Sequence, residues 1–256
     1  MTKAIRFHEL GGPEVLQLED VDLGAPGPGQ VLINQTAIGM NFRDIYRRIG
    51  QHSVDSFPAA LGIEGAGQVE AVGEGVEEFS VGQRVVAQGG PDGAFAEARI
   101  VPAGRVAALP DNIDDKTAAA MMVHGLTARM LLKGAYKVQP GDTILFHAAA
   151  GGVGLMVCQW AKLLGATVIG TVSTDEKAEL ARAHGCDHTI IYTREDFAAR
   201  VKEITDGEGV HAVYDSVGKD TFEGSITSLR PRGVMAQFGE SSGDPPKISP
   251  RRLGPL

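Results

Sequence analysis

The sequence contains very little cysteine. Its 256 residues include two, Cys158 and Cys186, which cannot build a disulfide framework or a four-cysteine metal site. Both lie in segments of apolar pattern, so we expect buried, unreactive thiols. This cysteine usage favours a reducing, cytoplasmic compartment.

Basic clusters and long apolar runs are also missing. The 24 lysines and arginines stand against 32 acidic residues, which gives a net charge of −8. Without a basic patch there is no electrostatic footprint for duplex nucleic acid, so no nucleic-acid partner is expected. The longest apolar stretch, Val138–Val157, is interrupted by Pro140, Gly141 and Asp142, and the N-terminus has no apolar run followed by a small-residue cleavage site. We therefore predict no membrane-spanning segment and no secretory signal.

The chain is instead rich in glycine and apolar residues. Hydrophobic residues make up 43% and there are 34 glycines, about twice the usual share, which excludes a disordered protein. The first hundred residues alternate between short strand-like runs and Gly/Pro turns, which predicts an antiparallel barrel or sandwich. The strands are expected at Ala4–His8, Val15–Glu19, Val31–Gly39, Gly67–Gly73, Arg84–Gln88, Ala94–Val101 and Val106–Leu109. One helix is expected at Asn41–Ile49, with Phe42, Ile45, Tyr46 and Ile49 on one face.

The pattern changes after Pro110. Two helices are predicted, Asp111–Met122 and Gly125–Leu132, with Asp114 or Asp115 as the cap of the first. From Asp142 onward strands alternate with helices, which indicates βαβ units and a parallel sheet. These elements are expected at Thr143–His147, Gly152–Leu164, Thr167–Val172, Asp175–Ala183, His188–Ile191, Glu195–Ile204, Val210–Ser216, Asp220–Leu229 and Val234–Phe238.

The turn after the first strand of this half has the pattern of a dinucleotide-binding site. In Ala148-Ala-Ala-Gly-Gly-Val-Gly154, small residues occupy the three fingerprint positions, Ala149, Gly151 and Gly154. Small side chains let the backbone approach a pyrophosphate, whose charge is met by amides at a helix N-terminus. The alternative is a structural glycine turn in an unrelated α/β domain.

The end of the next strand indicates which dinucleotide binds. NAD-binding proteins usually place an acidic residue there to bind the ribose hydroxyls. Here the strand ends at Ser173 and Thr174, the first carboxylate is Asp175, and Lys177 follows. Hydroxyls and a lysine suit a 2′-phosphate, so NADPH is the predicted cofactor. The alternative for Lys177 is a solvated lysine paired with Glu176 or Glu179 of its own helix.

Several segments together resemble the quinone oxidoreductases of the medium-chain dehydrogenase/reductase superfamily, the ζ-crystallin-like branch. They are GGPEVL (Gly11–Leu16), AIGMNFRDIYRRIG (Ala37–Gly50), GIEGAGQVEAVGEGV (Gly62–Val76), VGQRVVA (Val81–Ala87), FHAAAGGVG (Phe146–Gly154) and VYDSVGKDTF (Val213–Phe222). The resemblance implies an α/β protein with a GroES-like β-barrel catalytic domain at residues 1–123 and a Rossmann-type doubly wound parallel sheet at residues 124–256. It places NADPH between the two.

The resemblance also bears on metal binding. Zinc-dependent members carry Gly-His-Glu where this sequence has Gly62-Ile63-Glu64, and no cysteine precedes Cys158. Because a tetrahedral zinc site needs three or four ligands, no metal is expected and Glu64 is interpreted as a structural carboxylate.

Without a metal to polarise a carbonyl, the implied activity is hydride transfer from NADPH to a quinone or another electron-poor conjugated carbonyl. Asn41 and Tyr46 are the candidate catalytic residues, and both are expected to contact the nicotinamide or the acceptor. Tyr46 either donates a proton or simply packs, and Asp44 pairs with Arg47 or Arg48.

The resemblance implies further cofactor contacts, among them Thr127 at the nicotinamide amide and Tyr192 at the adenine end. His147, His124 and His52 have no evident partners and are interpreted as structural or surface residues. The full set of expected cofactor contacts is Asn41, Phe42, Tyr46, Thr127, Ala150, Gly151, Gly152, Val153, Gly154, Ser173, Thr174, Lys177, Tyr192, Ser216, Val217, Phe238, Gly239 and Ser241.

The sequence ends at RRLGPL, where full-length members continue into a sixth Rossmann strand that pairs across a dimer. On this basis we expect a truncated chain in which the family homodimer interface is lost, the sheet ends at Val234–Phe238 as an open edge, and NADPH binds weakly. Two other functions stay open: an enoyl-thioester reductase, or an NADPH-binding protein without turnover, with a sensing, crystallin-like or RNA-binding role.

Overall fold

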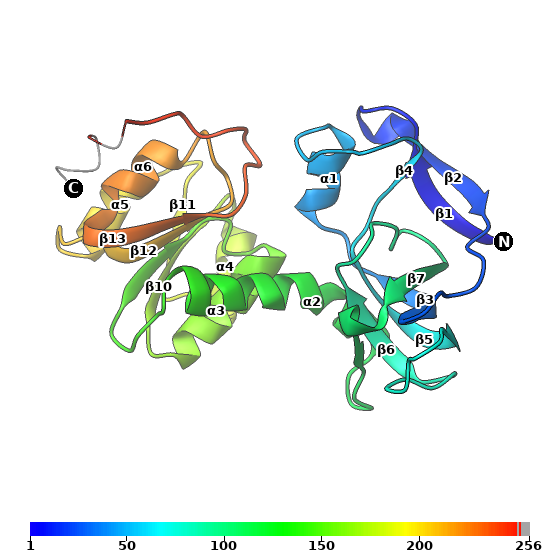
Figure 1. Ribbon diagram of the computed structural model, residues 1–256. Helices are drawn as coiled ribbons and strands as arrows, with labels where there is room; N and C mark the ends of the chain where they lie inside the picture. The colour runs from blue at the N-terminus through cyan, green and yellow to red at the C-terminus, as the bar shows by residue number, and fades with distance from the viewer. Residues whose placement is uncertain (250, 252–256) are drawn as a thin grey trace. The chain divides into compact units, whose positions relative to one another are not determined.

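The computed structural model describes residues 1–249 and 251. The chain forms two compact units, Met1–Val123 and His124–Leu256. The first consists mainly of strands and the second of alternating strands and helices (Figure 1).

The first unit is built from two antiparallel sheets. One has three strands in the order β2-β1-β4, and the other has five in the order β7-β3-β5-β6-β8. A bridge between Ala4 and Ala96 joins β1 to the segment that leads into β7. The elements are β1 (Thr2–Phe7), β2 (Leu16–Val21), β3 (Gln30–Ile38), α1 (Phe42–Arg48), β4 (Ala59–Ala60), β5 (Glu64–Val72), β6 (Arg84–Gln88), β7 (Ala98–Pro102) and β8 (Val106–Ala108), with short 3-10 turns at Pro13–Val15 and Ala103–Arg105.

The core of the five-stranded sheet follows from the alternation of its side chains. Val31 and Ile33 of β3 are buried against Val69 of β5 and Val101 of β7, and Ile33 is directly opposite Val69. Inward branched side chains of this kind pack well on a pleated surface. At Gly67 of β5 the two strands approach so closely that a Cβ atom would lie 2.0 Å from the Asn34 carbonyl oxygen.

The helical segment after β8 differs from the prediction of two helices. One helix, α2 (Asp115–Arg129), runs through Gly125 and continues as a π-helical turn, Met130–Ala135. Its start is set by Asp114, whose carboxylate accepts hydrogen bonds from the Thr117 amide and hydroxyl at 2.8 and 2.9 Å. A single glycine costs a helix only about 1 kcal/mol, so Gly125 does not end it.

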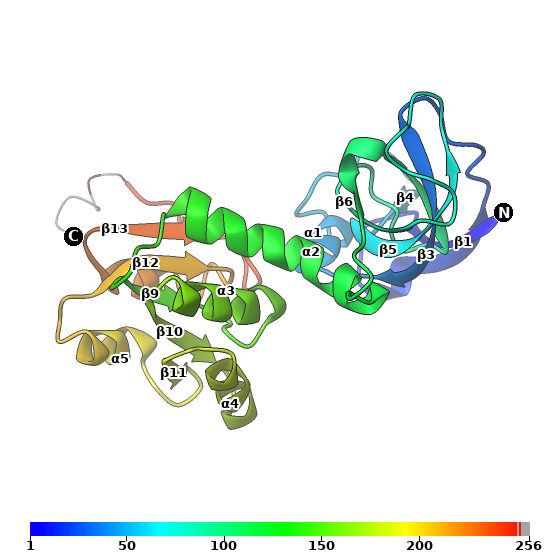
Figure 2. The same ribbon diagram turned by 90° about the horizontal axis from the view of Figure 1, so that it is seen from below.

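The second unit contains a five-stranded parallel sheet in the order β11-β10-β9-β12-β13. Figure 2 shows the strands side by side in this order. The chain adds β10 and β11 on one side of β9 and then returns to add β12 and β13 on the other, as in doubly wound folds. The elements are β9 (Thr143–Phe146), α3 (Gly152–Leu163), β10 (Thr167–Val172), α4 (Asp175–Ala183), β11 (His188–Ile191), α5 (Phe197–Ile204), β12 (Val210–Asp215), α6 (Phe222–Thr227) and β13 (Leu229–Gln237).

Both faces of this sheet are covered, because alternate residues of each strand enter two different cores. Phe146 of β9 is buried with α3 residues such as Val157, whereas Leu145 is buried with Val201 of α5. Cys158 and Cys186 are both free and buried, and burial was expected for both. Near-continuous apolar strands are the signature of a parallel sheet covered on both sides.

The outer strand β13 pairs with β12 alone among the described residues. Over the same residues, no helix combines the length and the apolar character needed to cross a membrane.

The glycine contacts lead to a stability prediction. Gly67→Ala should lower the free energy of unfolding by about 1–3 kcal/mol, because the added methyl meets the β3 backbone, which cannot move aside cheaply. Gly125→Ala is the matched control: apart from its chain neighbours and the backbone of its own helix, no atom lies within 4 Å of its added Cβ, so the change should stabilise α2 by about 0.5–1 kcal/mol. Urea unfolding of the two variants checks both, and equal effects would contradict the close approach of β3 and β5.

Candidate active site

The turn between β9 and α3 has the geometry of an anion-binding site. Gly151 is the N-cap of α3 in an extended conformation, and no side chain caps the helix. Gly151 and Gly152 are exposed, so the first amides of α3 are accessible to an anion. A helix N-terminus of this kind favours a phosphate through its free N–H groups and its dipole.

The small residues of this turn are required by its packing. A Cβ atom on Gly154 would lie 2.5 Å from the Ala149 carbonyl oxygen and 2.6 Å from that of Ala148. The Ala149 amide donates to the Thr171 carbonyl at 3.0 Å, which ties the turn to β10. Ala148 has a φ of 56°, a left-handed conformation that costs a non-glycine residue about 1 kcal/mol or more. Val153 and Ala150 are half-buried within the same turn.

At the end of β10 the structure brings together the three residues predicted to bind a 2′-phosphate. The Lys177 ammonium donates to the Ser173 hydroxyl at 3.1 Å, and the Lys177 amide donates to the Thr174 hydroxyl, the N-cap of α4, at 3.3 Å. Among the described residues, Lys177 forms no ion pair with Glu176 or Glu179, the alternative considered for it. Thr174 and Lys177 are exposed and Ser173 is half-buried. Lys177 brings the positive charge, and a hydrogen bond from the Thr174 hydroxyl lowers the pKa of the neighbouring Glu176.

The loop after β11 lies beside this cluster. The Thr193 hydroxyl donates to the Ser173 carbonyl at 3.0 Å, so its neighbour Tyr192, which is half exposed, is close in the chain to the same place. Arg194 pairs with Asp175 at 2.6 Å and adds a second cation that sequence reasoning missed. Only the fold shows that this arginine belongs here, because it lies 17 positions beyond Lys177 in the chain.

The loops after β12 and β13 are hydrogen-bonded to each other. The Ser241 amide donates to the Ser216 carbonyl at 3.2 Å, and the Ser242 amide to the Val217 carbonyl at 2.8 Å. Gly239 approaches Ser216 so closely that its Cβ would lie 2.9 Å from the Ser216 oxygen. Phe238 packs against Phe146 of β9, with ring centroids 5.7 Å apart. The structure therefore groups Ser216, Val217, Gly239 and Ser241, with Phe238 at the start of the second loop. Thr127 is half-buried in α2.

The expectation that His147 lacks partners was wrong. Its ring is completely buried, with Nδ1 3.0 Å from the Thr171 hydroxyl and Nε2 2.9 Å from the Ser225 hydroxyl. Burial lowers its pKa to about 4, although the nearby Asp215 carboxylate opposes the shift, so the imidazole is neutral at neutral pH. His124 lies against Gly152, and His52 packs edge-on against Tyr46.

In the first unit a buried carboxylate holds Asn41. Glu64 is completely buried; its Oε1 accepts from the Asn41 side-chain amide at 2.7 Å, and its Oε2 accepts from the Val123 backbone amide at 2.7 Å. Asn41 is the N-cap of α1, and its side-chain oxygen accepts from the amide of Asp44 in a capping box, so the NH2 group of the same side chain is the part that reaches Glu64. This agrees with the interpretation of Glu64 as a structural carboxylate.

The helix α1 buries fewer apolar side chains than its pattern predicts. Tyr46 is 8% exposed and contacts Phe42, with ring centroids 6.0 Å apart, whereas Phe42 is 59% exposed. Ile45 and Ile49 are also exposed. Phe42, Ile45 and Ile49 therefore leave an apolar face of α1 exposed.

The expected pairing of Asp44 with an arginine of its own helix was wrong. Its carboxylate is buried and accepts from the backbone amides of Asn41 at 2.9 Å and Gly62 at 3.1 Å. Burial raises the pKa of Asp44, and these two hydrogen bonds oppose the shift. Arg47 instead pairs with Asp92 at 3.2 Å, because the loop before β7 brings that carboxylate to α1.

Arg99 is a further buried charge that sequence reasoning missed. It is 4% exposed, and its guanidinium has no hydrogen-bond partner among the described residues. Burial lowers its pKa to about 10, while Asp92 and Glu64 oppose the shift. Arg99 stands opposite the buried Ile33 in the register of β3 and β7, so its side chain points inward. The signal in the sequence is a charged residue at a position of β7 where the alternation calls for an apolar one.

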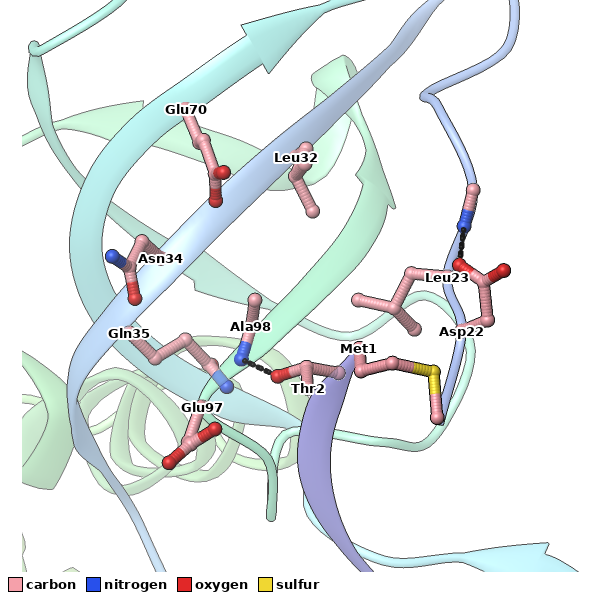
Figure 3. Close-up of a pocket in the computed structure, with 11 residues that line it drawn as sticks. Met1, Thr2, Asp22, Leu23, Leu32, Asn34, Gln35, Glu70, Glu97 and Ala98 are labelled. Atoms are coloured by element: carbon pink, nitrogen blue, oxygen red, sulfur yellow. Dashed lines mark hydrogen bonds between the residues drawn. The ribbon is translucent and has the colours of Figure 1, made fainter. Parts of the chain in front are cut away.

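The first unit also contains a cavity of about 560 Å³ (Figure 3). Met1, Leu23 and Leu32 line it together with the carboxylates of Asp22, Glu70 and Glu97 and other residues. None of the predicted site residues is among its lining, so we do not assign it to the chemistry.

The residues around Glu64 do not fit a zinc site. Both Glu64 oxygens already accept hydrogen bonds, and Ile63 stands beside it in the chain. Across residues 1–249 and 251, no group of three His, Cys, Asp or Glu side chains could hold a metal ion. The turn of α3 and the Lys177 cluster, by contrast, fit the phosphates of NADPH.

Comparisons with known proteins find a different family model in each unit. A family model described as an alcohol dehydrogenase GroES-like domain matches residues 27–111, and one described as a zinc-binding dehydrogenase matches residues 152–255. The fold and these matches define the class, the medium-chain dehydrogenase/reductases.

Individual relatives identify a narrower group within this class. A quinone oxidoreductase of Pseudomonas aeruginosa is 51% identical over 95% of this chain and 75% of its own length. A 2-haloacrylate reductase of Burkholderia is 49% identical over 97% of this chain and 77% of its own. The solved structure of Escherichia coli quinone oxidoreductase in complex with NADPH superposes with a TM-score of 0.96 at 44% identity, covering 99% of this chain and 78% of that one.

These similarities, at such identity and coverage, show that the chain belongs to the quinone oxidoreductase family of the medium-chain dehydrogenase/reductase superfamily. It spans about three quarters of the length of the relatives it matches.

The Glu64 contacts lead to a second prediction. Glu64→Gln should lower the free energy of unfolding by about 1–3 kcal/mol, because the new amide group faces at least one of two buried donors and leaves it unsatisfied. Glu70→Gln, the same change at an exposed position of β5, should stay within about 0.5 kcal/mol of the unmodified chain. Chemical denaturation measures both, and a neutral Glu64→Gln variant would show that Asn41 is not held by this carboxylate.

Proposed function

We propose that this protein is an NADPH-dependent quinone reductase that transfers hydride to a quinone or another electron-poor conjugated carbonyl. The observation that supports this most directly is the Lys177–Ser173–Thr174 cluster at the end of β10. It offers donors and positive charge where an NAD-binding protein would offer a carboxylate. Membership of the quinone oxidoreductase family supports the acceptor class.

NADPH supplies the hydride, and the protein supplies binding, orientation and the exclusion of water. The exposed amides at the start of α3 would bind the pyrophosphate. Ser173, Thr174 and Lys177 would bind the 2′-phosphate through charge-assisted hydrogen bonds. The joined loops after β12 and β13 would border the nicotinamide ribose, with Thr127 at the nicotinamide amide and Tyr192 at the adenine.

On α1, we assign Asn41 and Tyr46 to contacts with the nicotinamide or the acceptor. Glu64 accepts from the Asn41 side-chain amide at 2.7 Å, which fixes the orientation of that amide group. The exposed rings and branched chains of Phe42, Ile45 and Ile49 offer an apolar surface suited to a quinone ring. The Tyr46 hydroxyl is the candidate proton donor to the reduced acceptor.

A conjugated carboxylate is the second candidate acceptor. The relative named 2-haloacrylate reductase is 49% identical to this chain, and an acrylate is also an electron-poor conjugated system. The relatives favour turnover over the alternative of an NADPH-binding protein without activity. Free, buried thiols at Cys158 and Cys186 suit a reducing compartment, and we infer a cytoplasmic location.

Steady-state oxidation of NADPH tests the proposal. We expect turnover with a simple quinone, followed by the decrease in NADPH absorbance, and slower or no turnover with an α,β-unsaturated carboxylate. Faster oxidation with the carboxylate than with any quinone would favour the second candidate. NADPH binding without oxidation in the presence of either acceptor would contradict both.

Cofactor choice gives a sharper prediction. Lys177→Glu should weaken NADPH about 10- to 100-fold, because it removes a charge-assisted contact of about 1.5–3 kcal/mol, and should leave NADH nearly unchanged. Lys202→Glu, an exposed charge reversal on α5, is the control for the change in net charge. Titration calorimetry with both cofactors measures the effect, and an equal loss for NADPH and NADH would contradict the assignment of Lys177.

A further inference from the structure

A buried polar network joins three strands of the second unit. His147, Thr171, Asp215 and Ser225 are at most 2% exposed. The Ser225 hydroxyl donates to Asp215 Oδ2 at 2.7 Å and lies 2.9 Å from His147 Nε2, while Thr171 lies 3.0 Å from Nδ1. The network therefore runs from β12 through α6 to the residue after β9, and on to β10.

The direction of each hydrogen bond follows from counting protons. Ser225 has one hydroxyl proton, which it donates to Asp215, so its oxygen accepts from His147 and Nε2 carries the ring proton. Nδ1 then accepts from the Thr171 hydroxyl. The low pKa of His147, caused by its burial, agrees with this single neutral tautomer. Every member has a defined role, and such a satisfied buried network specifies one arrangement.

The two ends of the network hold the two loops on either side of the break in strand order. His147 directly precedes Ala148, whose φ of 56° begins the turn into α3. At the other end, Asp215 Oδ1 accepts from the amides of Val217 at 2.8 Å and Gly218 at 3.0 Å. In a doubly wound sheet a dinucleotide binds where the strand order reverses, here between β9 and β12.

We propose that Ser225 and His147 are positioning residues for NADPH, which fix the pyrophosphate turn and the ribose loop relative to each other without touching the cofactor. The inference rests on the proposed NADPH site and adds residues to it. Both loops contact parts that NADPH and NADH share, so a broken network weakens the two cofactors alike. That pattern differs from the one expected for Lys177.

The first experiment compares two buried serines of the α6 segment. Ser225→Ala removes the link between His147 and Asp215, whereas Ser228→Ala removes only a hydrogen bond to the Gly224 carbonyl. We expect Ser225→Ala to weaken NADPH and NADH each about 10-fold and Ser228→Ala to weaken neither, by titration calorimetry below the melting temperature of each variant. Equal cofactor affinities of the two variants would overturn the proposal.

The second experiment exchanges His147 for two amides and depends less on overall stability. Glutamine places its N–H donor where Nε2 stands and keeps the bond to Ser225, while asparagine keeps only an acceptor for Thr171. His147→Gln should therefore bind NADPH more tightly than His147→Asn at matched melting temperatures, and the reverse order would overturn the proposal. If the unmodified chain binds no NADPH, the proposed function fails first; if it binds and only the variant comparisons fail, the proposed function stands and this inference does not.

Discussion

The pairing of β9 with β12 at the centre of the parallel sheet is the constraint on which the candidate cofactor site depends. Ala212, Val213 and Tyr214 of β12 stand opposite Ile144, Leu145 and Phe146 of β9, although nearly seventy positions separate them in the chain. Because parallel strands end at the same edge, this register brings the glycine turn after β9 next to the loop after β12. The polar network beneath them can form only because that register is kept. Burial of the apolar strand residues on both faces stabilises the register, so the core and the site are not independent.

In the first unit, the local structure depends in the same way on one buried group, the carboxylate of Glu64. Glu64 begins β5 and is buried beside Gly39, where any side chain would collide with the carboxylate. Its two hydrogen bonds reach α1 and α2, two helices that are distant in sequence. A buried carboxylate is tolerated only when its oxygens accept hydrogen bonds. The burial of Glu64 therefore requires three features together: the donors at Asn41 and Val123 and the absence of a side chain at residue 39. The nearby guanidinium of Arg99 compensates part of the charge.

Local signals account for the parts of the structure that could be predicted. The bounds of β10 and α4 follow from a branched apolar run and from the cap at Thr174, both readable within a few residues. The glycine turn and the Lys177 cluster are equally local. The partners of His147 were missed because Thr171, Asp215 and Ser225 meet it only through strand order, and the break expected before Gly125 was wrong because one glycine does not outweigh a helix on both sides. Asp44 shows a third limit of prediction from the sequence. Its charge suggested an ion pair with a neighbouring arginine, but in the fold its carboxylate accepts from two backbone amides instead.

Two acidic residues directly follow Thr174, and both bear on the preference for a 2′-phosphate. Asp175 and Glu176 begin α4 and would repel a phosphate if their charges were uncompensated. The Asp175 carboxylate is paired with Arg194 at 2.6 Å, and both side chains are more than half exposed, so the pair is weak and exchangeable. In the proposed site, the Arg194 guanidinium has further N–H donors for a phosphate at Lys177 while it keeps its pair with Asp175. The 2′-hydroxyl of NADH brings no charge for Arg194 to bind, so an arginine that stays paired with Asp175 would favour the phosphorylated cofactor. Charge at this end of the sheet is set by two segments, the start of α4 and the loop after β11, and both must be considered to explain the choice.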